Sequence, residues 1–416
     1  MKCRHCGDQL ALQMIDLGFA PPSNAYLTED ELDQPERYLP LRVKVCESCW
    51  LVQTEDFAER DLLFTSNYAY FSSTSTSWVN HSRAYFEMIT AELSLGANDF
   101  VVELASNDGY LLKNFVEANI PCLGIEPTQE TALHAETQGV PTIQEFFGTE
   151  LAKKLETSHP KADLIIGNNV YAHVPDINDF TSGLKHLLAP TGTVTLEFPH
   201  LLKLISECQF DTIYHEHYSY LSLKTVMRIF QAAGLRIFHV EELSTHGGSL
   251  RIFGCHGNDP RQDRDSVSQM ISQEDAFGLE EPNAYQLFER KAIQIRNEFI
   301  EFLIQKQRLG HVVVAYGAAA KGNTLLNYAG VKKDLLPMVF DAASSKQEKF
   351  LPGTHIPVRH PNHLRSLNPD AVVILPWNLA GEITELLAEI MVTQPELWIA
   401  APKLTCLNTE ATDSAG

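Results

Sequence analysis

Seven consecutive residues, Tyr214 to Tyr220, place three tyrosines, two histidines and one glutamate side by side. Imidazole has an unperturbed pKa near neutrality, so a held histidine can accept a proton at cellular pH. A tyrosine hydroxyl can donate to an oxygen that gains negative charge in the same step. The segment therefore indicates proton transfer beside a polar ligand. In a regular strand His217 would point away from the face of Tyr214 and Glu216, so we expect a loop or tight bend.

Two C-x-x-C pairs near the N-terminus indicate a metal site. Their cysteines are Cys3, Cys6, Cys46 and Cys49. Four thiolates suit a closed tetrahedral zinc site, and a region of about 60 residues has too little core to fold without such a staple. A redox role for the pairs is the competing interpretation. His5, between the first two cysteines, is a weaker candidate ligand.

A strand-to-helix turn at Glu103–Gly109 occupies the place of a nucleotide-binding loop, but it lacks the three glycines of a dinucleotide fingerprint. S-adenosylmethionine (SAM) has no pyrophosphate, so a turn that binds it can carry side chains where a dinucleotide-binding turn needs glycines. An acidic residue that ends the next strand can accept both ribose hydroxyls. The alternative is an ordinary turn with a strand-end carboxylate. The cofactor-binding candidates are Glu103, Ala105, Ser106, Asn107, Gly109, Glu126, Pro127 and Asn168.

A second small-residue turn, Tyr316–Thr324, follows a strand candidate near the C-terminus. Its backbone, the following helix N-terminus and Lys321 could hold phosphate, or it could be a tight turn with a solvated lysine. The aromatic and hydroxyl residues of Tyr68–Ser73 suit a lid over a ligand or an interdomain seam. The substrate-binding candidates are Tyr70, Ser72, Tyr316, Lys321, Asn323 and Thr324.

Another polar stretch, Asn168–Val174, follows a buried strand candidate. Open α/β sheets bind ligands at the carboxyl ends of their strands, where this stretch lies. A lone histidine is often structural, but His173 lies at the same expected edge as the other motifs.

Bulk composition limits the partners and the compartment. The 416 residues carry a formal net charge of −21, which argues against nucleic-acid binding. No apolar run is long enough for a membrane span, and Met1–Cys6 does not resemble a signal peptide. Because the cysteines do not form an extracellular disulfide pattern, we expect a reducing, cytoplasmic location.

The order of strand and helix candidates predicts an α/β fold. A mainly parallel sheet is expected from strands at 100–106, 121–127, 141–147, 162–171, 192–200, 235–243 and 249–257. The last two strands are joined by a short glycine turn and should form an antiparallel hairpin, as in the common methyltransferase sheet. After the polar stretch 258–281, a long helix at 284–309 precedes a second α/β unit. Its expected strands are 311–316, 338–341, 371–375 and 396–401, with a helix near 382–391.

Together these motifs resemble the nucleotide-sugar C-methyltransferases, particularly those acting at C-3 of TDP-4-keto-deoxy sugars. The similarity covers nearly the whole chain, and its order is more specific than any one motif. The motifs are the paired C-x-x-C, Y-x-Y-x-S-S, E-x-A-S-N-D-G, N-x-x-x-H-V, Y-H-E-H-Y-S-Y, H-G-G-S-L-R and Y-G-A-x-A-K-G-N-T.

The resemblance implies a zinc-binding domain (1–60), a class I SAM-dependent methyltransferase domain (61–260) and a Rossmann-like domain that contacts the nucleotide diphosphate (261–416). It implies a nucleotide-diphosphate 4-keto sugar as substrate, in the cleft between the last two domains. The catalytic positions of the family correspond to Tyr68, His173, Tyr214, Glu216 and His217.

Carbon methylation beside a ketone needs a base at the carbon and donors at the ketone oxygen. We expect His217 to be the base, Glu216 and His173 to orient it or share its proton, and Tyr68 or Tyr214 to hold the oxygen. The alternatives are a SAM-dependent sugar O-methyltransferase, a non-catalytic zinc-ribbon scaffold and an NAD-dependent sugar oxidoreductase. We expect a monomer.

Overall fold

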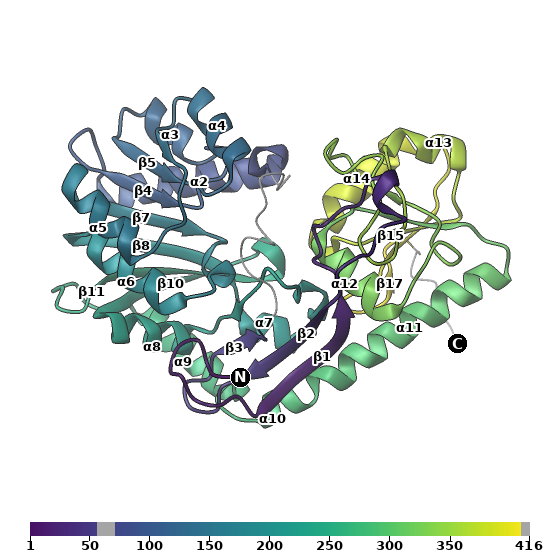
Figure 1. Cartoon of the computed structure of the whole chain (residues 1–416), viewed down its shortest axis with the longest axis horizontal. Coiled ribbons are helices and arrows are strands. Elements are labelled where there is room, and N and C mark those ends of the chain that lie inside the picture. The colour runs from purple at the N-terminus through teal and green to yellow at the C-terminus, as the bar shows by residue number, and fades with distance from the viewer. Residues whose placement is uncertain (56–70, 409–416) are drawn as a thin grey trace, which may run out of the picture.

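The central part of the chain folds around a seven-stranded sheet in the computed structural model, which describes residues 1–55 and 71–408. In Figure 1 this sheet and its helices form the lobe at the left. In sheet order its strands are β10 (Leu235–Leu243), β11 (Ser249–His256), β8 (Leu188–Pro199), β7 (Ala162–Asn168), β4 (Val101–Leu104), β5 (Cys122–Ile125) and β6 (Thr142–Ile143).

Pairing within this sheet confirms the predicted methyltransferase arrangement. Strands β4 to β8 run parallel, whereas β11 pairs antiparallel with both β8 and β10. Two of the predicted strands were clearly too long, since β7 ends at Asn168 and not at residue 171, and β6 ends at Ile143 and not at Phe147. The amide of Glu145 turns back to the carbonyl of Ile143, so the polar residues that follow leave the sheet.

Helices cover both faces of the central sheet, as the buried runs in its strands require. Helices α2 (Thr76–Leu93), α3 (Leu112–Glu117) and α4 (Gln129–Thr137) pack on one face. The helices that pack on the other face are α5 (Thr149–Ser158), α6 (Ile177–Leu187), α8 (Leu223–Ala233) and α9 (Asp265–Phe277). Helix α9 lies in the polar stretch 258–281, for which no helix was predicted; its apolar face consists of Val267 and Met270, with Ile271 partly buried beside them.

The N-terminal residues form a four-stranded antiparallel sheet that takes its last strand from the tyrosine-rich segment. Its order is β1 (Leu12–Ala20), β2 (Leu39–Val45), β3 (Val52–Thr54) and β9 (Ser219–Tyr220). Side chains of β2 alternate between buried and partly exposed, as in a sheet with one solvated face. Because β9 follows the predicted bend directly, this sheet fixes one end of the bend.

The C-terminal part contains a second α/β unit, the lobe at the right of Figure 1. Its helices are α11 (Phe288–Arg308), after the short α10 (Asn283–Gln286), then α12 (Ala320–Ala329), α13 (Leu364–Leu367) and α14 (Ala380–Ile390). In sheet order its strands are β14 (Val358–Arg359), β13 (Val339–Phe340), β12 (Val313–Tyr316), β15 (Ala371–Ile374), β16 (Glu396–Ile399) and β17 (Thr405–Cys406). The four predicted strands are confirmed. Strands β14 and β17 were not predicted, because two residues give no readable period.

A shared apolar core joins the N-terminal sheet to the C-terminal unit. Side chains of β1 and β2 pack in the same cluster as those of α11 and α12. Figure 1 shows β1 beside α11 along the lower side of the molecule. Within the described ranges, no helix has the length and apolar character needed to cross a bilayer.

Candidate active site

The four cysteines of the C-x-x-C pairs lie together as predicted. Their sulfur atoms all lie within 4.8 Å of one another, with 3.5 Å between Cys3 and Cys49 and 3.4 Å between Cys6 and Cys46. Sulfurs bound to zinc at about 2.3 Å are separated by about 3.8 Å in a tetrahedron. The donor set therefore fits Zn²⁺. His5 lies outside the sulfur cluster and contacts Asn178, with 2.8 Å between His5 Nδ1 and the amide oxygen.

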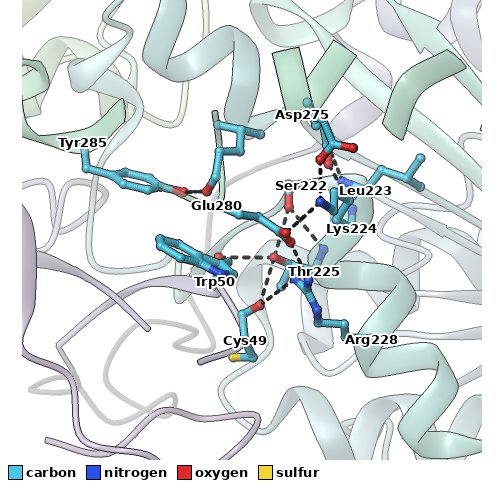
Figure 2. A network of polar contacts seen from close by, with 12 residues as sticks. Cys49, Trp50, Ser222, Leu223, Lys224, Thr225, Arg228, Asp275, Glu280 and Tyr285 are labelled. Atoms are coloured by element: carbon cyan, nitrogen blue, oxygen red, sulfur yellow. Dashed lines mark hydrogen bonds and ion pairs between the residues drawn. The ribbon is translucent and has the colours of Figure 1, made fainter. Parts of the chain in front are cut away.

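The second cysteine pair is anchored to helix α8 of the central unit (Figure 2). The Thr225 hydroxyl donates to the carbonyl of Trp50 at 3.2 Å, and Arg228 donates to the carbonyl of Cys49 at 3.3 Å. Arg228 also pairs with Glu280, with 2.5 Å between nitrogen and oxygen. The second cysteine pair is therefore joined directly to helix α8 of the methyltransferase sheet by hydrogen bonds.

The metal-binding region also holds the backbone of the tyrosine-rich segment. The Thr54 hydroxyl donates to the carbonyl of His217 at 3.1 Å, and the Thr54 amide donates to the carbonyl of Tyr218 at 3.2 Å. Arg4 donates to the same Tyr218 carbonyl at 2.8 Å. The side chain of Gln53 accepts from the Arg4 amide and donates to the sulfur of Cys3, at 2.9 and 3.3 Å. A continuous path of contacts therefore leads from the sulfur cluster to the bend.

The turn after β4 has a strained backbone of the kind found at binding sites. Ala105 and Asn107 both adopt the left-handed conformation, with φ of 54° and 49°. Gly109 has φ of 79°, and a Cβ there would lie 3.2 Å from the Ala135 backbone, so this conformation and this close packing both favour glycine. Glu126, at the end of β5, accepts from the Asn107 amide at 2.9 Å. Pro127 follows it and is partly buried.

Buried polar atoms without partners gather at the carboxyl ends of β4 and β7, where the strand order reverses. Within the described part of the chain, the atoms with no hydrogen-bond partner include Oε2 of Glu103, Oγ of Ser106, Oδ1 of Asp108, both side-chain polar atoms of Asn168 and Oδ1 of Asn169. Burial, with the charges of Asp108 and Glu126, raises the pKa of Glu103 well above its usual value. The oxygen atoms among them can accept from the ribose hydroxyls and the ammonium group of SAM, and the amide nitrogen of Asn168 can donate.

The predicted bend is confirmed, because the amide of His217 donates to the carbonyl of Tyr214 at 3.0 Å and closes a tight turn. The ring centroids of Tyr214 and His217 are 3.9 Å apart, and those of His173 and His217 are 4.6 Å apart. His217 Nδ1 lies 2.8 Å from the carbonyl oxygen of Thr212. Its Nε2 is buried and has no hydrogen-bond partner among the described residues.

Burial keeps both central imidazoles neutral. It lowers the pKa of His217 well below 6.5, and the charge of a protonated His173 would lower it further. Burial likewise lowers the pKa of His173 to about 4. A neutral imidazole with a buried, unshared Nε2 can act as a general base.

The other predicted catalytic residues are placed as follows. Glu216 is 2% exposed and accepts from the amide nitrogen of Asn24, at 2.8 Å to one carboxylate oxygen and 2.9 Å to the other. Tyr68 and Tyr70 lie outside the described residues. Ser72 lies against the cofactor turn, where its amide donates to Asn107 Oδ1 at 2.9 Å.

The loop after β12 brings the C-terminal unit to the same region. Thr324 donates to the carbonyl of Ile213, next to the bend, at 2.8 Å. Asn323 donates to the carbonyl of Ser23 at 2.6 Å. Tyr316 is 4% exposed, and its hydroxyl has no partner within the described part. The side chains of Asn323 and Thr324 therefore join this loop to the rest of the chain.

Lys321 is held at the edge of this loop by contacts within the C-terminal unit. Its Nζ lies 2.6 Å from Asn378 Oδ1 and 4.6 Å from the centre of the Trp377 ring. Burial lowers the pKa of Lys321, and the negative charge of Asp211 opposes that effect. The Trp377 indole donates to Asp211 at 2.7 Å.

Four residues near the bend were not singled out from the sequence: Asn24, Asp211, His246 and Trp377. Gly247 has φ of 91°, and a Cβ there would lie 2.3 Å from the Trp377 ring, so the H-G-G turn packs directly on Trp377. The neighbouring His246 ring meets Trp78 edge-on, with centroids 5.1 Å apart. The H-G-G-S-L-R motif indicated a turn here, but no residue in it indicated that the turn would pack on Trp377 or Trp78.

Comparison with known families matches all three regions of the chain. A model described as a zinc binding domain matches residues 3–64, one described as a methyltransferase domain matches residues 79–240, and one described as a C-methyltransferase C-terminal domain matches residues 244–402. Fold and site thus define a SAM-dependent methyltransferase with a zinc-binding N-terminal region.

A relative of nearly the same length refines this class. The chain is 32% identical to the C-methyltransferase NovU of Streptomyces niveus over 411 residues, which cover 99% of this chain and 98% of the relative. The chain therefore belongs to the C-methyltransferase family.

Two solved structures resemble a part of the chain. The protein PH0226 of Pyrococcus horikoshii has a TM-score of 0.38 at 14% identity, over 48% of this chain and 99% of its own. A SAM-dependent methyltransferase of Clostridium acetobutylicum has a TM-score of 0.35 at 13% identity, over 43% of this chain and 92% of its own.

Proposed function

We propose that this C-methyltransferase methylates C-3 of a nucleotide-linked 4-keto-deoxy sugar, with TDP as the nucleotide, in deoxysugar biosynthesis. One observation carries the proposal: Nε2 of His217 is buried without a hydrogen-bond partner among the described residues, and the His217 ring contacts the rings of Tyr214 and His173. The motif resemblance to enzymes of this substrate class supports the choice of sugar.

The chemistry follows from the weak acidity of a carbon beside a ketone. His217 Nε2 takes the proton from C-3, and the electron pair of the broken C–H bond moves toward the C-4 oxygen to form an enolate. Tyr214 and Tyr68 are the candidates for donating a hydrogen bond to that oxygen. Glu216 and His173 orient the base or share its proton.

Residues at the carboxyl ends of β4, β5 and β7 would hold the cofactor. The carboxyl oxygens of Glu103 and Glu126 and the amide oxygen of Asn168 offer acceptors for ribose hydroxyls and an ammonium group. The turn Ala105–Gly109, with Ser106 and Asn107, allows close approach of the backbone. When bound, SAM supplies an electrophilic methyl group.

Each of the three regions of the chain would have its own role. We assign zinc binding to residues 1–60, cofactor binding to residues 61–260 and binding of the nucleotide diphosphate to residues 261–416. The loop Tyr316–Thr324 begins helix α12, whose N-terminus favours phosphate, and Lys321 adds a cation. Tyr70 and Ser72 would contribute to sugar binding, in a monomeric enzyme.

Incubation of the enzyme with SAM and a panel of nucleotide 4-keto sugars tests this function. Mass spectrometry should show the gain of one methyl group on a TDP-linked sugar, and NMR should locate the new methyl carbon on C-3. A methyl group found on a sugar oxygen would instead support O-methylation. Absence of product with every sugar, from enzyme that binds SAM in calorimetry, would refute the assigned substrate.

A further inference from the structure

A segment of the N-terminal region, Pro21–Tyr26, passes between the catalytic bend and the loop after β12. Asn24 contacts both carboxylate oxygens of Glu216, at 2.8 and 2.9 Å from its amide nitrogen. The carbonyl of Ser23 accepts from Asn323 at 2.6 Å, and the hydroxyl of Tyr26 donates to the carbonyl of Ala318. Three contacts within four residues therefore join this segment to both the bend and the loop after β12.

The contact between Asn24 and Glu216 is long-range and specific. The two residues are 192 positions apart, and Glu216 is buried. An amide donor satisfies part of a buried carboxylate without adding charge, whereas a lysine or arginine in its place would pair with the carboxylate as an ion.

We propose that Asn24 is a positioning residue of the methyl-transfer reaction, which fixes the Glu216 side chain in the bend that also carries Tyr214 and His217, so that the N-terminal region forms part of the active site. This inference rests on the proposed function for its kinetic consequence, but the structural consequence is independent of the substrate. On the N-terminal segment, the charges of Glu216, Lys346 and Asp341 all act on the Tyr26 hydroxyl, and on the loop after β7 the His173 ring is hydrogen-bonded to the Glu216 backbone.

Two substitutions of Asn24 separate positioning from simple folding. Asn24→Ala removes the donor, and we expect kcat to fall about 10- to 100-fold, as for other small losses of alignment, with little change in SAM affinity. Asn24→Asp has the same shape but sets two carboxyl groups face to face, so that one must hold a proton. Because the protonated aspartic acid can donate as the amide does, we expect its kcat to recover as the pH falls from about 8 to about 6.

Glu289→Ala is the matched control. Glu289, on helix α11, also holds the N-terminal region, because its carboxylate accepts from the Asp16 amide at 2.9 Å, but this contact involves no residue of the bend. We expect this variant to keep the kcat and the pH profile of the unchanged enzyme.

Hydrogen–deuterium exchange of residues 212–221, without any sugar, gives a readout that needs no substrate. We expect faster exchange in Asn24→Ala and not in Glu289→Ala. Unchanged exchange together with unchanged kcat in Asn24→Ala would overturn the inference. An Asn24→Asp variant whose kcat does not recover as the pH falls from about 8 to about 6 would also overturn it. If the unchanged enzyme methylates no sugar, the proposed function fails, while the exchange data still decide the role of Asn24.

Discussion

The Nδ1 atom of His217 lies 2.8 Å from the carbonyl oxygen of Thr212. A carbonyl can only accept a hydrogen bond, so Nδ1 carries the imidazole proton and Nε2 presents its lone pair. Thr212 ends a short helical turn that directly precedes the bend. The local backbone therefore selects the tautomer that a base at Nε2 requires.

Replacing His217 by asparagine should lower turnover by about 100-fold or more, because the base is lost. Binding of SAM, measured by calorimetry, should stay unchanged. His215→Asn is the control from the same bend, since His215 contacts the carbonyl of Leu39 and belongs to no proposed catalytic group. Near-normal turnover of His217→Asn would refute the assigned role of the base.

The acidic limb of the pH profile of kcat/KM should lie below 6.5. This ratio reports the free enzyme, in which burial holds the pKa of His217 well below 6.5. Activity is therefore expected to persist as the pH falls through 6.5 and to be lost only when Nε2 becomes protonated. Initial rates at low substrate concentration across the pH range measure the limb. A midpoint at or above 6.5 would mean that another group limits the rate.

Loss of the metal should disturb the bend as well as the N-terminal fold. Cys49→Ser is expected to lower the zinc content and the melting temperature, and to speed hydrogen exchange in residues 217–220, because Gln53, Arg4 and Thr54 link the sulfur cluster to that backbone. Metal analysis, calorimetry and exchange measure these effects. Cys406→Ser, which lies far from the sulfur cluster in sequence and is partly exposed, should leave all three unchanged. Full zinc content in Cys49→Ser would contradict the four-thiolate site.

Glu197→Gln should reduce the free energy of unfolding by about 3 kcal/mol near neutral pH, as expected when a buried ion pair loses one partner. Burial alone would raise the pKa of Glu197, but the hydrogen bond from His81 and the charge of Arg251 lower it to about 2. The difference in the free energy of unfolding between the unchanged protein and Glu197→Gln should therefore be fully present above pH 4.5. It should shrink as the pH falls toward 2. Denaturant unfolding at neutral and acidic pH measures it.

Glu92→Gln provides the control for that experiment. Glu92 pairs with Arg264 on the surface, where ion pairs contribute about 0–1 kcal/mol. A Glu197→Gln variant as stable as Glu92→Gln, or one whose deficit does not change with pH, would count against the ion-pair account.

Features with a local signal could be predicted from the sequence. The bend follows from the face that each side chain of Tyr214–His217 must occupy, and the antiparallel hairpin follows from the short glycine turn at 244–248. Helix α9 was missed because its inward side includes Glu274, a buried carboxylate that accepts from the amides of Leu223 and Lys224 at 2.6 and 3.0 Å. A helix whose buried face includes a capping carboxylate shows a weak apolar period.

Contacts between distant segments could not be predicted. Asn24 lies in a loop with no period, and Trp377 lies in a short turn after β15. Each gains its role only when the N-terminal sheet and the C-terminal unit pack against the bend. A single sequence contains no signal for contacts between segments so far apart. The cysteine pairs and the polar residues at strand ends, by contrast, can be recognised from their local spacing.

Deuterium uptake at C-3 tests the central claim most directly. The enzyme is incubated in D₂O with the TDP-4-keto sugar and S-adenosylhomocysteine, which carries no methyl group to transfer. We predict exchange of the C-3 hydrogen with the unchanged enzyme and none with His217→Asn, measured by NMR. Equal exchange by both proteins, or none by an enzyme that methylates the same sugar, would contradict the account.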